Sequence, residues 1–277
     1  MLGAIIGDMV GSIYEFDPIK SKNFDIYDER MFMTDDSFLT IAVAKVLINN
    51  FPIDYSAESL NKIKNQLIKE FAQTWENNPH AGWGGSFNHW CHEVCLRGYA
   101  KPYNSCGNGA GMRISPVGWI AKTEEELKIL SNTVTSITHN HPEGLKGAEA
   151  IALCIFMALH KYSKDDIKQR MISEYYPEIK EMDFEDLVQN YGFSEICQES
   201  VPQAIYCFLV SNSLEDAIRN CIAIGGDCDT TGAMAGAIAE AYYKSDLLSP
   251  LEKIYLDTRI NAQYRPLIHR FYNLLSC

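Results

Sequence analysis

Apolar residues recur at helical spacing along most of the chain, and no segment shows the alternation typical of a strand. Between residues 56 and 75, one helical face carries the apolar residues Leu60, Ile63, Leu67, Ile68 and Phe71, while the other is charged. The same reasoning predicts helices over residues 3–14, 38–48, 123–137, 144–162, 167–175, 200–209, 214–224, 230–243 and 249–275. We therefore expect an all-α protein, with residues 1–277 forming a single compact orthogonal multi-helix domain.

Two short turns carry paired aspartates beside hydroxyl groups. Thr34-Asp35-Asp36-Ser37 precedes an apolar helix, and Asp227-Cys228-Asp229-Thr230 precedes a helix rich in small residues. Each aspartate could simply cap its own helix, because helix starts offer unpaired amides. Four carboxylates brought together would repel one another unless cations neutralised them. Because both turns repeat the pattern, we interpret them as halves of one dinuclear metal site in a central cleft.

The donor atoms that we assign in these turns are carboxylate and hydroxyl oxygens, without thiolate or imidazole. Such donors favour hard ions, so we expect two divalent cations, Mg²⁺ or Mn²⁺, with Ca²⁺ as an alternative and Zn²⁺ disfavoured. Residues 89–95 hold histidine and cysteine side chains, but no second ligand pair follows at a zinc-like spacing. Cys91 and Cys95, at positions i and i+4, fit one face of a helix better.

The N-terminal segment repeats glycine every fourth residue, at Gly3, Gly7 and Gly11, which allows a helix to pack flush against a neighbour. Asp8 and Glu15 are the acidic exceptions, and a continuous helix would place them on the same side. Two interpretations stay open. Glu15 could reach a cavity, or Asp8 could cap or pair elsewhere while Glu15 faces solvent.

Three further stretches could line a cleft. The glycines between Gly107 and Arg113 could expose amides that wrap a phosphate, with the arginine pairing or positioning it. Residues 77–87 combine glycine with aromatic rings that could stack on a flat ligand or pack in the core. His139 and His141, between two helices, could line a cleft or act as caps.

Composition narrows the class of protein. The formal charge of −12 argues against a general nucleic-acid binder. Nine scattered cysteines suit reduced thiols better than a disulfide framework. The start lacks the pattern of a signal peptide, and no apolar run is long enough for a membrane span, so we expect a cytoplasmic protein without membrane contacts. The oligomeric state is left open.

Taken together, the motifs resemble those of the ADP-ribosylglycohydrolase family over nearly the whole chain. The resemblance is carried by five blocks, Gly7-Asp8 to Glu15, Thr34-Asp35-Asp36-Ser37, Gly107-Asn108-Gly109-Ala110-Gly111-Met112-Arg113, Thr138-His139-Asn140-His141-Pro142 and Gly226-Asp227-Cys228-Asp229-Thr230. The chain departs from the family pattern at Ser37, Cys228 and Thr231, none of which removes an expected ligand.

The resemblance implies roles for individual residues. The implied metal ligands are Thr34, Asp35, Asp36, Asp227, Asp229 and Thr230. The implied substrate-binding residues are Gly107, Asn108, Gly109, Ala110, Gly111, Met112 and His139. The implied catalytic residues are Glu15, Asp36 and Asp227, with Glu15 or a metal-bound aspartate handling the proton.

The implied activity is hydrolysis of an N- or O-glycosidic bond at the anomeric carbon of ADP-ribose, in an ADP-ribosylated protein or small molecule. Two alternatives remain at this point. Paired cations also suit a phosphohydrolase acting on an ADP-ribose-like nucleotide. A relative without activity could instead bind ADP-ribose, because a shared fold does not guarantee chemistry.

Overall fold

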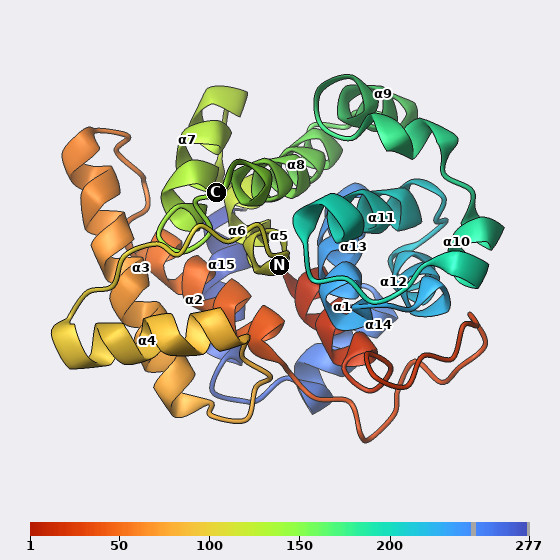
Figure 1. Ribbon diagram of the computed structural model, residues 1–277, viewed down its shortest axis with the longest axis horizontal. Coiled ribbons are helices and arrows are strands. Elements are labelled where there is room, and N and C mark those ends of the chain that lie inside the picture. Colours follow the sequence, from red (N-terminus) through yellow and green to blue (C-terminus); the bar gives the residue numbers. More distant parts are fainter. Residues whose placement is uncertain (245–247, 276–277) are drawn as a thin grey trace.

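The computed structural model describes residues 1–244 and 248–275, and it is organised around helix α13, Cys228–Tyr242. Every residue from Cys228 to Ala241 in α13 is buried. Helices α1 (Leu2–Gly11), α8 (Pro142–Leu159), α11 (Cys197–Leu209) and α12 (Leu214–Ile224) pack around it (Figure 1). A helix enclosed in this way needs small or apolar residues on all its faces, which is why its sequence shows no polar stripe.

Helices α1 and α13 touch backbone to backbone through glycine. A Cβ atom added at Gly7 would lie 2.0 Å from the carbonyl oxygen of Gly232, far inside contact distance. A Cβ atom added at Gly11 would lie 2.2 Å from Cα of Asp229. The glycine repeat seen in the sequence therefore aligns α1 with the first turn of α13, and it brings Asp8 to the same place.

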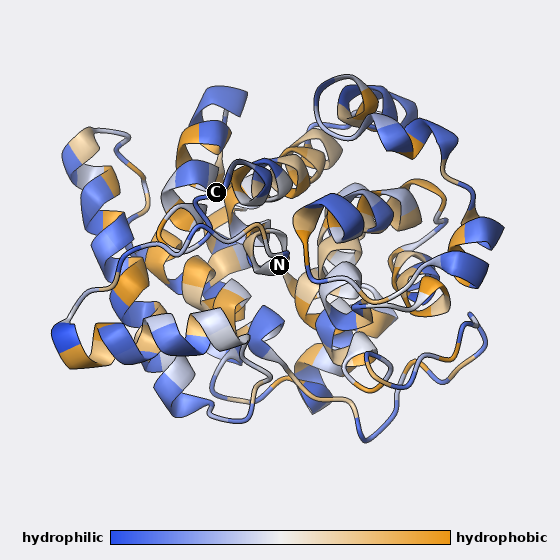
Figure 2. Ribbon diagram, viewed as in Figure 1, coloured by the Kyte–Doolittle hydropathy of each residue, from blue (hydrophilic) through white to orange (hydrophobic). Residues whose placement is uncertain are grey.

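A second group of helices builds the other half of the molecule (Figure 1). Helix α2 (Asp35–Asn49) contacts α1 on one side and α3 (Ala57–Asn77) on the other. The remaining members are α4 (Gly85–Arg97), α5 (Gly109–Met112), α6 (Ser115–Ile120) and α7 (Glu124–Thr135). Figure 2 shows hydrophobic residues gathered on α2 and α8 in the interior and hydrophilic ones on the outer helices. The amphipathic α3 covers this core, as its apolar stripe predicted.

The periphery is more helical than the sequence indicated. Residues 164–198 hold α9 (Lys164–Glu174), the 3₁₀ segment η1 (Pro177–Glu181) and α10 (Phe184–Asn190). Helix α10 was not predicted because it is only seven residues long and offers just three apolar positions, Phe184, Leu187 and Val188, which are partly buried. The C-terminal region contains α14 (Pro250–Ile254), the π-helical segment η2 (Tyr255–Arg259) and α15 (Arg265–Leu275).

The all-α prediction is confirmed, since the described ranges contain no strand and only an isolated bridge between Gly107 and Ile196. The first helix is shorter than expected. It ends at Gly11, so Glu15 lies beyond a following turn and not on the helix. Eight cysteines are free thiols, and the ninth, Cys277, lies outside the described residues. Within residues 1–244 and 248–275, no helix has the length and apolar character that crossing a membrane requires.

Candidate active site and metal centre

The first acidic turn begins helix α2. Thr34 is its N-cap, and the hydroxyl of Thr34 accepts a hydrogen bond from the amide of Asp36. The carboxylate of Asp36 performs no capping. It is 2% exposed, and its Oδ2 atom accepts bonds from the hydroxyls of Thr34 at 3.3 Å and Thr230 at 3.4 Å. The side chain that caps α2 is therefore that of Thr34, while Asp36 is directed toward the second turn.

The second acidic turn begins helix α13. Gly225 and Gly226 have φ angles of +69° and +75°, a left-handed conformation that glycine adopts without strain. Asp227 occupies the N-cap position, yet its side chain makes no capping bond. Its Oδ2 atom instead accepts a bond of 2.6 Å from Nδ2 of Asn108. Asp229, expected between the helices, lies in the first turn of α13 itself, because the helix begins at Cys228 and not at Thr230.

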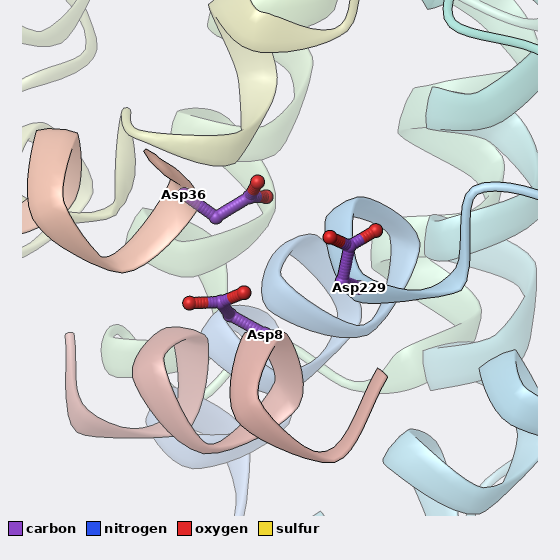
Figure 3. A group of neighbouring side chains, drawn as sticks. All are labelled: Asp8, Asp36 and Asp229. Atoms are coloured by element: carbon purple, nitrogen blue, oxygen red, sulfur yellow. The ribbon is translucent and has the colours of Figure 1, made fainter. Parts of the chain in front are cut away.

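The two turns meet. Carboxylate oxygens of Asp36, Asp229 and Asp8 lie within 4.8 Å of one another, and Figure 3 shows the three side chains converging from α2, α13 and α1. A second group of the same compactness combines Glu15, Asp227 and Asp229. Asp229 belongs to both groups. Asp35 is in neither, although its side chain lines the same cleft.

Asp8 is the site residue that the sequence did not assign. It is fully buried, and it accepts bonds from the amide and hydroxyl of Thr34, at 3.0 and 2.6 Å, and from the amide and hydroxyl of Ser37. Asp8 thereby holds the first acidic turn against α1. An acidic residue within an otherwise apolar, glycine-faced helix was the available signal, because such a residue is costly to bury without a partner.

The carboxylates raise one another's pKa. Burial is the main cause for Asp36 and Asp229, whose pKa values lie well above the ordinary range, and neighbouring acidic groups add to the effect. Burial also raises the pKa of Asp8 to about 6, against the opposing hydrogen bonds from Ser37 and Thr34. For Glu15, burial followed by the charge of Asp227 raises the pKa to about 7.

A hard divalent cation fits this donor set. Among the described residues, Oδ1 of Asp36 is buried and has no hydrogen-bond partner, which leaves an acceptor available to an ion. Both compact groups contain only carboxylates. Cys228, although it lies between two of these aspartates in sequence, directs its sulfur to the carbonyl oxygen of Gly11. Oxygen donors without sulfur or nitrogen are those preferred by Mg²⁺ and Mn²⁺.

The glycine-rich segment does not form the expected array of free amides. The amides of Gly111 and Met112 donate to the carbonyl oxygen of Asn108 within short helix α5, and the amide of Gly107 donates to the hydroxyl of Ser105. Ala110 and Gly111 are buried, with Gly111 facing the side chain of Met234. The physical reason is that the segment closes into a helical turn, which uses its own donors. Gly107, Asn108, Gly109 and Met112 line the cleft.

Arg113 also differs from its expected role. Its side chain is 1% exposed, and Nη2 points to the hydroxyl of Thr138 and to Nδ1 of His139, while the guanidinium lies over the ring of Phe71. Burial, followed by the charge of Arg113, lowers the pKa of His139 well below its ordinary value. His139 is therefore neutral, and its imidazole lies against Gly109 at the edge of the cleft. His141 caps helix α8.

These residues surround a cleft of about 380 Å³, within the size range of small-molecule sites. The cleft is lined by Glu15 and by six residues of the two acidic turns, Thr34, Asp35, Asp36, Asp227, Asp229 and Thr230. Phe87 contributes to the wall, whereas Trp83 is buried and stacked on it. Of residues 77–87, only part is loop, because α4 begins at Gly85.

Comparison with known proteins identifies this arrangement. A profile of the ADP-ribosylglycohydrolase family matches residues 1–274. The chain belongs to this family. Family membership confirms the resemblance noted in the sequence, and it indicates a glycohydrolase enzyme.

The individual relatives have low sequence identity to this chain, but they align with most of its length. The chain is 25% identical to mouse ADP-ribosylhydrolase ARH3 over 313 residues, covering 88% of this chain and 82% of the relative. It is 25% identical to the human ARH3, over 89% and 85% of the two chains. It is 22% identical to ADP-ribosylarginine hydrolase Tri1 of Pseudomonas putida, over 98% and 77%. A solved structure described as an "ADP-ribosylglycohydrolase-related protein complex" has the same fold, with a TM-score of 0.72, 19% identity and coverage of 99% and 97%.

Proposed function

We propose that the protein is a metal-dependent hydrolase that cleaves the N- or O-glycosidic bond at the anomeric carbon of ADP-ribose. The observation that carries the proposal is the convergence of Asp36 and Asp229, from distant parts of the chain, at one oxygen-only site in a cleft of substrate size. The names of the ARH3 and Tri1 relatives support the choice of ADP-ribose. The product is free ADP-ribose, and the substrate is a modified protein or small molecule.

The acidic turns supply the ligands. Two divalent cations would be held by Asp35, Asp36, Asp227 and Asp229, with the hydroxyls of Thr34 and Thr230, and Mg²⁺ or Mn²⁺ suits these donors. When bound, such ions supply Lewis acidity, by lowering the pKa of a water and orienting ribose hydroxyls. Asp8 keeps the Thr34 turn in position through its four hydrogen bonds. Asn108 does the same for Asp227.

Glu15 is suited to proton transfer. Its carboxyl group lines the cleft, is partly buried, and has a pKa raised to about 7, mainly by burial. That value describes the metal-free protein, and the assignment of a proton-transfer role rests on the position of Glu15 beside Asp227 and Asp229 in the cleft. We assign to a carboxylate oxygen of Glu15 the acceptance of a proton from the attacking water and its delivery to the leaving group. His139, being neutral and wedged between Arg113 and Gly109, shapes the wall and does not carry this proton.

The test compares arginine-, serine- and nucleobase-linked ADP-ribose as substrates, with Mg²⁺ or Mn²⁺ and with chelator. Release of free ADP-ribose that requires metal is the expected result. The Asp227→Ala variant should lose both turnover and metal binding, and full activity of that variant in chelator would contradict the proposal. Formation of AMP and ribose phosphate would favour a phosphohydrolase. Binding of ADP-ribose without turnover of any substrate would favour a non-catalytic relative.

A further inference from the structure

The side chain of Lys20 joins two carbonyl oxygens that lie far from it in sequence. Its Nζ atom donates to the carbonyl oxygen of Ile224 at 2.5 Å and to that of Tyr191 at 2.7 Å. Lys20 is partly buried, and it is not among the residues that line the cleft. Ile224 is the last residue of α12, where carbonyl groups lack a donor within the helix. The ammonium of Lys20 supplies that donor from outside the cleft.

The contact of Lys20 with α12 also supports the turn that leads to Asp227. A Cβ atom added at Gly225 would lie 3.1 Å from Cε of Lys20, and one added at Gly226 would lie 2.7 Å from Cε1 of Tyr191. The backbone of this turn is therefore enclosed between the side chain of Lys20 and the ring of Tyr191. Because Nζ bonds to the carbonyl groups of both neighbouring segments, it holds the enclosure together.

Lys20 is the first residue after Glu15 that a hydrogen bond anchors. The amide of Glu15 donates to the carbonyl oxygen of Gly11 at 3.1 Å, which fixes Glu15 on its N-terminal side. Within the parts of the chain that the structure describes, residues 16–19 make no hydrogen bond, and all four are exposed. The position of Lys20 therefore limits how far the chain after Glu15 can move.

The two segments that Lys20 joins carry neighbouring carboxylates. Lys20 follows Glu15 by five positions, and its partner Ile224 precedes Asp227 by three. Carboxylate oxygens of Glu15 and Asp227 lie within 4.8 Å of each other in one compact group with Asp229. Small displacements of such groups lower the rate of a reaction strongly. A helix cap alone would explain the bond to Ile224, and it would affect stability only.

We propose that Lys20 is a positioning residue, whose ammonium fixes the segment after Glu15 against the turn before Asp227 and thereby sets the spacing of these two carboxylates. The inference rests on the proposed function for the role of Glu15 in the reaction. Lys20 contacts neither metal nor substrate in this role, since both of its bonds go to backbone carbonyl groups.

The experiment compares Lys20→Met with Lys22→Met in the full chain. Methionine keeps an apolar stem but cannot donate. At saturating Mn²⁺, we expect Lys20→Met to lower kcat for arginine- or serine-linked ADP-ribosyl peptides by about 10- to 100-fold, and to weaken Mn²⁺ binding in calorimetry by about 10-fold. Lys22 pairs with Asp216 at the surface, so its substitution should leave both values within about 2-fold. A lower Tm for Lys20→Met, with kcat and Mn²⁺ affinity unchanged, would overturn the proposal.

An insertion separates positioning from capping. Two glycines placed between Asp17 and Pro18 leave both bonds of Lys20 possible but lengthen the chain that joins Lys20 to Glu15. Exposed backbone without hydrogen bonds tolerates such insertions. We expect kcat to fall by about 10-fold or more, with Tm closer to that of the unsubstituted protein than in Lys20→Met. Full kcat in the insertion variant would show that Lys20 only caps α12. If Lys20→Met does not fold, the insertion variant provides the test.

The separation between the carboxylates of Glu15 and Asp227, in crystal structures of the metal-free variants, tests the inference independently of activity. We expect it to increase by about 1 Å or more in Lys20→Met and in the insertion variant, and to stay the same in Lys22→Met. If the unsubstituted protein hydrolyses no ADP-ribosyl peptide, the proposed function fails, and this separation still decides the role of Lys20. An unchanged separation would overturn that role.

Discussion

Nδ2 of Asn108 lies 2.6 Å from Oδ2 of Asp227 and joins two parts of the protein that are 119 positions apart in sequence. The amide of Asn108 is itself fixed, because it donates to the carbonyl oxygen of Glu195. A side chain held in this way can orient a carboxylate without contacting a substrate. The glycine-rich segment therefore supports the second acidic turn, in addition to lining the cleft.

We expect Asn108→Ala to weaken activity and metal affinity by about 10- to 100-fold, because outer hydrogen bonds orient metal ligands. Steady-state kinetics and calorimetric titration with Mn²⁺ measure the two effects. Asn190→Ala is the control, since Nδ2 of Asn190 bonds to Asp186 on the exposed helix α10. Equal metal affinity in Asn108→Ala and in the unsubstituted protein would contradict this role.

We expect Asp36→Asn to stabilise the protein in chelator while removing the metal response. The buried carboxylate of Asp36 lies among other acidic groups, and an amide removes that repulsion at nearly constant shape. Functional sites commonly lower the stability of the folded protein in this way. Removing the repulsion should raise the free energy of unfolding by about 1–2 kcal/mol. For a chain of this size, Tm should rise by about 2–4 °C for each kcal/mol. Thermal unfolding in chelator measures the stabilisation, and the rise in Tm on adding Mn²⁺ measures the metal response. If that rise is unchanged in the variant, Asp36 is ruled out as a ligand.

The acidic cluster should also make the metal-free protein less stable as pH rises. Folded-state pKa values are about 6 for Asp8 and about 7 for Glu15, both above the ordinary carboxyl values of 3.8 and 4.5. Between about pH 4 and 7, the folded state therefore binds more protons at these groups than the unfolded state does. The free energy of unfolding then falls with rising pH, and the stabilising contribution of the protonated forms is lost as pH passes the folded pKa values.

Urea denaturation in chelator from pH 4.5 to 7.5 measures this slope. Surface carboxylates also contribute to the slope of the free energy of unfolding against pH. The informative quantity is therefore the difference in this slope between the unsubstituted protein and Asp36→Asn. We expect a less negative slope in the variant, because it lacks one of the groups with a raised pKa. Saturating Mg²⁺ should oppose the decline, since a cation favours the charged carboxylates. Identical slopes for the two proteins in chelator would show that the cluster does not titrate as a unit.

The contact between α1 and α13 leaves no space for a side chain, so Gly7→Ala should destabilise the protein strongly. The added methyl group would meet the backbone of Gly232, which has no side chain to move aside. We expect a loss of about 1–3 kcal/mol or more in the free energy of unfolding, as for other overpacked cores. Gly85→Ala is the control, because nothing lies within 4 Å of its added Cβ atom. Equal stability of both variants in urea denaturation would be inconsistent with this packing.

Local patterns predicted a large part of the molecule. The spacing of Leu60, Ile63 and Leu67 identified helix α3, and hydroxyl and acidic residues marked the starts of α2 and α13, because periodicity and capping depend on neighbours within a few residues. The peripheral helix α10 was missed because its seven residues hold only three apolar positions, too few to establish a periodic pattern.

The sequence by itself determined that the chain is helical, where most helices begin, and which two turns carry the paired acids. The tertiary structure alone decided that Asp8 belongs with Asp36 and Asp229, and that Asn108 bonds to Asp227. The physical reason is distance along the chain. The contact of Asp8 with Asp229 also depends on how closely α1 and α13 approach, which the glycines permit but which only the packed structure fixes.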